Sequence, residues 1–163
     1  MDGIDKNFKD IIDRQADLME CIKGVPRILG FQYGENIAEI MMENCGSSVY
    51  QFTKSSEYLS LSTFHKSCIV FDLVRQLTKP LMLLHKQNYV HGDIKPDNIC
   101  MKRRDPDAPK KKYQMGDNYE SEFEFTLIDF GIISRFKIKK ACKVYSYTIG
   151  NLMFSTLRSL KCQ

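Results

Sequence analysis

The sequence predicts an α+β fold, and three observations support this. Two strand-like runs, 27–33 and 36–42, flank Gly34 and Glu35 in the pattern of an antiparallel hairpin. Apolar residues then recur at near-helical spacing over 64–87, which predicts one long helix that Pro80 kinks or makes irregular. Finally, two stretches further on pass from apolar β-forming residues into polar clusters, as short strands that end in loops do.

Composition indicates one ordinary globular domain. The chain has 163 residues, of which 43% are hydrophobic and 27% are charged. The formal charge of +4 is modest, so we expect no nucleic-acid partner. Six scattered cysteines without a Cys-x-x-Cys pair indicate reduced thiols, and hence an intracellular protein, cytoplasmic or nuclear. The absence of a long apolar run predicts no membrane span.

The polar clusters carry residues suited to phosphate chemistry. The first offers a carboxylate (Asp93), an ammonium group (Lys95) and an amide (Asn98), and the second offers another carboxylate, Asp129. Hard oxygen ligands on neighbouring loops suit Mg²⁺, and a lysine can neutralise phosphate charge. The set fits phosphoryl transfer, with one base, one cation and two metal ligands. The alternative is that these are two charged turns of an unrelated domain.

The same clusters resemble two protein-kinase motifs. The run HGDIKPDN resembles the catalytic loop of that superfamily, and LIDFG resembles the metal-binding segment that follows it. The resemblance implies that Asp93 is the catalytic base and that Lys95 contacts the transferred phosphate. It implies that Asn98 and Asp129 bind Mg²⁺. A lysine at this point of the loop favours serine or threonine of a protein substrate as the phosphate acceptor.

A third motif resembles the casein kinase I family in particular. It is the run MENCGSS, which begins at Met42, and a later run at 149–156 resembles the substrate-binding loop of that family. The resemblance makes Met42 the gatekeeper beside an adenine pocket and makes residues 43–45 the hinge, whose backbone binds adenine. Met42 could equally be a plain core residue. The ATP contacts expected from this resemblance are Met42, Glu43, Asn44, Cys45 and Cys100.

The resemblance also suggests how the chain is organised. Residues 1–46, with a predicted helix at 8–22, correspond to the lower small lobe and hinge. Residues 47–163 correspond to the large lobe up to the substrate-binding loop. Within it, 102–122 is charged and rich in proline, and we expect a flexible insertion there. That insertion is either a solvated loop or a docking site for an acidic partner.

Some kinase features are missing from the sequence. None of its nine glycines lies in a Gly-x-Gly-x-x-Gly run, and no Val-Ala-x-Lys strand occurs before the first predicted helix. We therefore expect a protein-kinase-like fold with a partial small lobe and the first part of the helical large lobe. Gly92 replaces the usual arginine, so control by an activation-segment phosphate is not expected.

Three functions remain open at this point. The first is a serine/threonine protein kinase that uses ATP and Mg²⁺ to phosphorylate a protein substrate. The second is a pseudokinase-like binding module with impaired catalysis, and the third is a truncated kinase fragment without independent activity.

Overall fold

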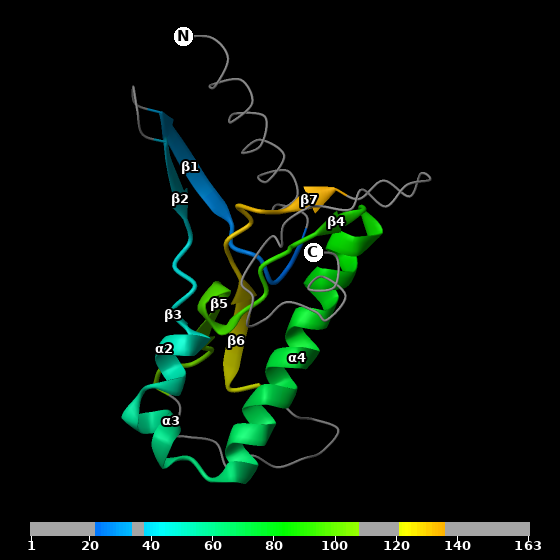
Figure 1. Ribbon diagram of the computed structural model, residues 1–163. Coiled ribbons are helices and arrows are strands. Elements are labelled where there is room, and N and C mark those ends of the chain that lie inside the picture. Colours follow the sequence, from blue (N-terminus) through cyan, green and yellow to red (C-terminus); the bar gives the residue numbers. More distant parts are fainter. Residues whose placement is uncertain (1–21, 34–37, 108–120, 136–163) are drawn as a thin grey trace, which may run out of the picture.

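The computed structural model describes residues 22–33, 38–107 and 121–135 (Figure 1). The predicted helix at 8–22, except its last residue, and the run 149–156 lie outside these residues. The predicted mixture of helices and small sheets is confirmed. The elements are β1 (Ile28–Tyr33), β2 (Ala38–Met42), β3 (Ser47–Ser48), α2 (Val49–Thr53), α3 (Ser56–Ser60), α4 (Thr63–Lys86), β4 (Tyr89–Val90), η1 (Pro96–Asn98), β5 (Ile99–Arg103), β6 (Phe123–Leu127) and β7 (Ser134–Arg135).

The predicted hairpin is confirmed. β1 and β2 pair antiparallel, with Ile28 opposite Met42 and a bulge between Ile28 and Gly30. Figure 1 shows the hairpin extending away from the rest of the described chain. Accordingly, Leu29 and Met41 are 51% and 66% exposed. A hairpin of two strands is only marginally stable by itself, so its position depends on how the chain leaves β2.

The central sheet has the strand order β3-β5-β6 and is antiparallel throughout. Because neighbouring side chains on a strand point to opposite faces, its two faces differ. The inner face is buried against α4 and contributes Ile99, Met101, Phe125 and Leu127 to the core. The outer face carries the two cross-strand pairs Cys100–Thr126 and Lys102–Glu124.

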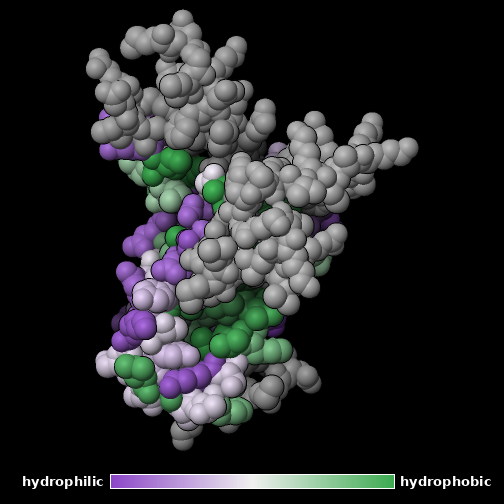
Figure 2. All heavy atoms as spheres, in the orientation of Figure 1, coloured by the Kyte–Doolittle hydropathy of each residue, from purple (hydrophilic) through white to green (hydrophobic). Residues whose placement is uncertain are grey.

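The predicted long helix is confirmed as α4. Ser62 caps its start, where the Ser62 hydroxyl accepts a hydrogen bond from the His65 N–H at 3.3 Å. The helix runs through Pro80 without a break, and Pro80 is buried. One side of α4 buries Ile69, Leu77 and Leu84 in the core. The other side is exposed, and Figure 2 shows hydrophobic residues gathered over it: Val70, Phe71, Val74 and Met82.

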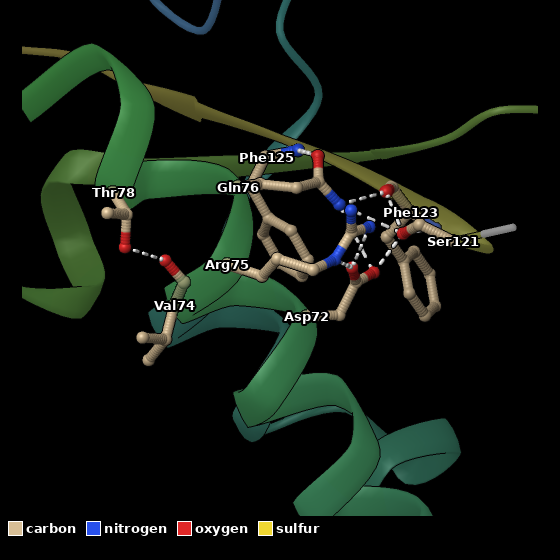
Figure 3. Close-up of polar contacts among 8 residues, drawn as sticks. All are labelled: Asp72, Val74, Arg75, Gln76, Thr78, Ser121, Phe123 and Phe125. Carbon is tan, nitrogen blue, oxygen red and sulfur yellow. Dashed lines mark hydrogen bonds and ion pairs between the residues drawn. The ribbon is translucent and has the colours of Figure 1, made fainter. Parts of the chain in front are cut away.

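A polar cluster ties α4 to the outer edge of β6 (Figure 3). The Gln76 side-chain oxygen accepts from the Phe125 N–H at 3.2 Å, and its nitrogen donates to the Phe123 carbonyl at 2.9 Å. Gln76 thus continues the sheet's hydrogen bonding at an edge where no further strand pairs among the residues that the structure describes. Beside it, the buried Asp72 carboxylate accepts from the Ser121 hydroxyl and from Arg75. The cluster satisfies polar groups that would otherwise be buried without partners.

The structure changes two of the sequence-based boundaries. Lys102 and Arg103 belong to β5, so strand pairing continues into the predicted insertion at 102–122. At its other end, Ser121 is 6% exposed and Glu122 forms an ion pair with Arg103. The predicted ends of the insertion, which were based on charge and proline content, are wrong. Charged residues at both ends are held in extended structure by pairing between β5 and β6. Residues 108–120 lie outside the described residues.

The stretch after β3 contains two short helices, α2 and α3, each capped by a serine, Ser48 and Ser55. In the described part of the chain, no helix combines the length and hydropathy needed to cross a membrane.

Candidate active site

Two sequence motifs meet at the end of the central sheet. α4 ends at Lys86, and Asn88, two residues later with a φ of 64°, turns the chain into β4. The catalytic-loop motif follows and leads through η1 into β5, while the second motif follows β6. The Ile128 N–H donates to the Asn98 carbonyl at 2.9 Å. This bond places Asn98 beside the chain that carries Asp129.

His91 is a structural residue at this junction. It is 1% exposed, and its ring lies 4.8 Å from that of Phe130. Nδ1 accepts from the Asp93 N–H at 3.3 Å, which leaves Nε2 to donate to the Ile128 carbonyl at 3.1 Å. Burial lowers the pKa of His91. A neutral ring therefore joins the two motifs.

The lowered pKa of His91 predicts a loss of stability in acid. The unfolded chain binds a proton near the ordinary pKa of 6.5 while the folded ring resists it, so the free energy of unfolding should fall as pH drops below 6.5. Denaturant unfolding at several pH values measures this. His91→Gln should flatten that part of the profile, whereas His85→Gln, at an exposed position on α4, should not. Equal pH profiles for the wild type and His91→Gln would contradict this interpretation.

Asp93 is held by two neighbouring side chains. Lys95 Nζ lies 2.6 Å from Asp93 Oδ2, and Asn98 Nδ2 donates to the same oxygen and to the Asp93 carbonyl, both at 2.9 Å. The hydrogen bond to Asp93 is the main cause that raises the pKa of Lys95, so its ammonium stays charged. The structure thus brings Asp93, Lys95 and Asn98 into direct contact.

Asn98 and Asp129 each carry an oxygen of the kind that a magnesium ion prefers. Asn98 is 6% exposed, and its amide hydrogens point to Asp93. Among the described residues, no hydrogen-bond donor reaches its side-chain oxygen. Asp129 is exposed and has a φ of 63°, an uncommon conformation for a residue with a side chain. A buried amide oxygen without a donor, beside a carboxylate, suits a hard cation.

The segment after β2 is held in place at both ends. The Glu43 N–H donates to the Arg27 carbonyl at 3.0 Å, and the Glu43 carboxylate accepts from the Arg27 N–H at 2.8 Å. At the other end, the Asn44 side chain accepts from the Gly46 N–H at 2.9 Å. Gly46 has a φ of 87°, and a Cβ there would lie 2.2 Å from the Met101 carbonyl oxygen. Only glycine therefore lets this segment pass so close to β5.

The remaining predicted nucleotide contacts differ in their surroundings. Cys100 is 8% exposed and lies on β5 opposite Thr126, near the thiol of Cys45. Burial raises the pKa of both thiols, so both are neutral near pH 7. Met42 is 43% exposed, so among the described residues it is not packed into the core.

Sequence reasoning missed a contribution from the chain before β1. Gly24 has a φ of 99°, and its carbonyl accepts from the Leu127 N–H at 2.9 Å. Residues 23–25 and Arg27 line a cavity of 740 Å³ together with the segment 43–45 and the outer face of β5 and β6. The only signal in the sequence was the Gly24-Val25-Pro26 run, which indicated no more than the end of a helix.

Comparison with known proteins identifies kinases as relatives. No protein-family profile matches the chain. A non-specific serine/threonine protein kinase of Drosophila melanogaster is 26% identical over 159 residues, which cover 95% of this chain and 20% of that protein. The fold is protein-kinase-like. Shorter matches include the serine/threonine-protein kinase PKZ1 of Phytophthora infestans, 35% identical over 60 residues (37% of this chain, 15% of that protein).

A kinase of a plant also matches, again over only part of its length. The serine/threonine-protein kinase AFC1 of Arabidopsis thaliana is 30% identical over 110 residues, covering 62% of this chain and 22% of that protein. These matches support a place in the eukaryotic protein kinase superfamily. The chain spans only 15–22% of the length of the three relatives named here.

Proposed function

We propose that the chain carries the catalytic middle of a serine/threonine protein kinase, which transfers the γ-phosphate of ATP to a protein hydroxyl. The observation that carries this proposal is the contact of Asp93 with both Lys95 and Asn98, beside the strand that leads to Asp129. Base, cation and metal ligands are the parts that phosphoryl transfer requires.

Asp93 has the role of orienting the acceptor hydroxyl and accepting its proton. Its carboxylate is fixed by Asn98 and by the Lys95 ammonium, 2.6 Å away. Lys95 can turn from Asp93 toward the moving phosphoryl group and stabilise the charge that develops there. Much of the rate then comes from the fixed position of these groups relative to the substrate.

Nucleotide binding is assigned to the hinge and to the outer face of β5. In the hinge, the Glu43 carbonyl is an acceptor that receives only a weak hydrogen bond, from the Cys45 thiol at 3.4 Å among the described residues. The Cys45 N–H is the matching donor for the adenine edge. Cys100 forms the floor under the ring, and Met42 lies at its edge. The resemblance of residues 42–48 to casein kinase I supports this arrangement.

Asn98 and Asp129 are the residues that would hold Mg²⁺. When bound, the ion neutralises phosphate charge and orients the phosphates for transfer. The Asn98 amide is oriented for this by its two hydrogen bonds to Asp93, which leave its oxygen to face away from that residue. Because of these bonds, the metal site and the base are positioned by one side chain.

A nucleotide-binding module with little catalysis is the second candidate. The observation that favours it is the absence of a Gly-x-Gly-x-x-Gly run among the nine glycines of the chain. Backbone N–H groups of such a loop normally cover the phosphates. Without them in this chain, ATP binding is expected to be weak.

A single-turnover experiment distinguishes the two candidates. The full chain is mixed with γ-labelled ATP, Mg²⁺ and a protein rich in exposed serine and threonine, and labelled phosphoserine and phosphothreonine are quantified. Transfer that depends on both Mg²⁺ and enzyme concentration supports the kinase. ATP binding without any transfer supports the binding module.

The metal assignment predicts a specific defect in Asp129→Asn. Wild-type chain should bind ATP weakly, with higher affinity in the presence of Mg²⁺, because Asp129 would help to hold the ion, which would neutralise phosphate charge. Asp129→Asn should lose the Mg²⁺-dependent gain and keep the affinity measured without the metal. Calorimetric titration of ATP with and without Mg²⁺ measures both values.

A matched substitution, Asp107→Asn, removes an exposed carboxylate outside the site and should change neither value. An unchanged Mg²⁺ effect in Asp129→Asn would remove Asp129 from the metal site. Sub-micromolar affinity of the wild type would show that other residues replace the missing phosphate-binding loop.

A further inference from the structure

The cavity of 740 Å³ adjoins the proposed nucleotide contacts, but its described walls contain none of the proposed catalytic or metal-binding residues. It lies between the chain before β1, the hinge, and the outer face of β5 and β6. The described residues of its walls include neither Cys100 nor the proposed metal ligands Asn98 and Asp129. Only the hinge residues 43–45 are shared with the proposed adenine contacts. Its volume lies within the range of about 300–1,000 Å³ that is usual for small-molecule sites.

The walls of the cavity carry an excess of positive charge. Lys23, Arg27 and Lys102 line it, and none of these three side chains forms an ion pair within the part of the chain that the structure describes. Two carboxylates, those of Glu43 and Glu124, also line the cavity and oppose this charge. The Glu43 carboxylate already accepts a hydrogen bond from the Arg27 N–H. The half-exposed thiol of Cys45 adds no charge because burial raises its pKa. Three cations around a concave surface attract an anion more strongly than the same charges on an open surface do.

The inner wall of the cavity is apolar. Ile22 and Val25 line it and are 3% and 7% exposed. Both belong to the hydrophobic core, and a carbon skeleton would cover the part of them that faces the cavity, which an inorganic anion would leave in contact with water. Charge and apolar surface together therefore define the ligand more closely than either does alone.

We propose that this cavity binds a small organic dianion. Its two negative charges, on two carboxylates or on one phosphate, pair with Arg27, Lys23 and Lys102, and its carbon skeleton rests on Ile22 and Val25. Hydrogen bonds from a guanidinium or ammonium group to an oxyanion are short and strong, and they favour a ligand with two negative charges over one with a single charge. The proposal does not depend on phosphoryl transfer by this chain.

Calorimetry with three aromatic probes tests the proposal in buffer without divalent metal and at constant ionic strength. The probes are isophthalate (two carboxylates), phenyl phosphate (one dianionic group) and benzoate (one carboxylate). We expect saturable binding of at least one dianion, with benzoate weaker by about tenfold because one charged contact is lost. The stronger of the two dianions identifies the acidic group. Failure of both to bind at millimolar concentration would overturn the proposal.

Variants show whether the bound dianion is in this cavity. Arg27→Gln and Lys102→Gln should each weaken binding about tenfold, because each removes one charged hydrogen bond. Lys79→Gln removes an equally exposed charge on α4 and should leave binding unchanged. Both cavity side chains are exposed, so the variants should fold, and unfolding curves verify this. Affinities that the two cavity variants leave unchanged would overturn the proposal.

One further variant separates the cavity from the proposed phosphate site. Asp129→Asn should leave dianion binding intact, since Asp129 is not part of the described cavity wall. A changed dianion affinity in this variant would place the ligand at the catalytic centre and overturn the proposal. Conversely, absence of phosphoryl transfer would contradict the kinase activity, and dianion binding that Arg27→Gln and Lys102→Gln weaken in the same chain would still support the cavity site.

Discussion

Asp93→Asn should lower kcat by about 10²- to 10⁴-fold and leave nucleotide affinity largely unchanged. Asparagine is the same size as aspartate and keeps the backbone carbonyl that accepts from Asn98 at 2.9 Å. It cannot accept the proton of the acceptor hydroxyl, and it no longer attracts the Lys95 ammonium. Because Asp93 has no proposed contact with the metal or the nucleotide, its loss should act on the acceptor and not on ATP.

Single-turnover transfer and ATP titration, performed on the same variants, separate these effects. Asp129→Asn should impair both transfer and Mg²⁺-dependent binding, whereas Asp93→Asn should impair transfer alone. Asp97→Asn is a matched control, because Asp97 is an exposed carboxylate in the same loop. Full turnover by Asp93→Asn would mean that the loop is not catalytic, and the binding-module function would take its place.

The local features of this fold could be read from the sequence. The hairpin of β1 and β2 and the helix α4 follow from side-chain periodicity, which acts over a few neighbouring residues. The contact of His91 with Phe130 could be anticipated because each residue belongs to one of the two kinase-like motifs, and the order of these motifs along the chain indicates that they lie close together. Motifs also placed Asp93, Lys95 and Asn98 in one loop, where the structure joins them directly.

Features that depend on distant residues could not be predicted in this way. Ser121 looked like part of a flexible insertion, yet its hydroxyl bonds to Asp72, which is 49 residues away. The cavity near the hinge needs the turn at Gly24 to lie against β6, and no periodic pattern indicates that contact. Both the Ser121–Asp72 bond and the cavity depend on packing between distant parts of the chain. Sequence patterns therefore show that these residues are polar but do not show which residues they contact.

Gln76→Leu should destabilise the chain by about 1–3 kcal/mol, because one buried backbone group loses its partner. The Gln76 side chain accepts from the Phe125 N–H at the edge of β6 where, in the described part of the chain, no further strand pairs. Leucine has a similar size and favours helices, so the helix itself should not suffer. The Ser121 hydroxyl lies close to both Asp72 and the Phe123 carbonyl, so by turning from Asp72 it can donate to that carbonyl in place of Gln76, and this limits the expected loss.

Urea unfolding of the wild type and the variant measures the difference in free energy of unfolding. Gln87→Leu is the control, because Gln87 is exposed at the end of α4, and it should change stability by much less than Gln76→Leu. Hydrogen exchange of the Phe125 amide adds a local test, since that amide should exchange faster in Gln76→Leu than in Gln87→Leu. A variant as stable as the wild type, with the Phe125 amide still protected, would show that water or a backbone shift replaces Gln76. In that case the edge of β6 would not depend on α4 for its hydrogen bonds.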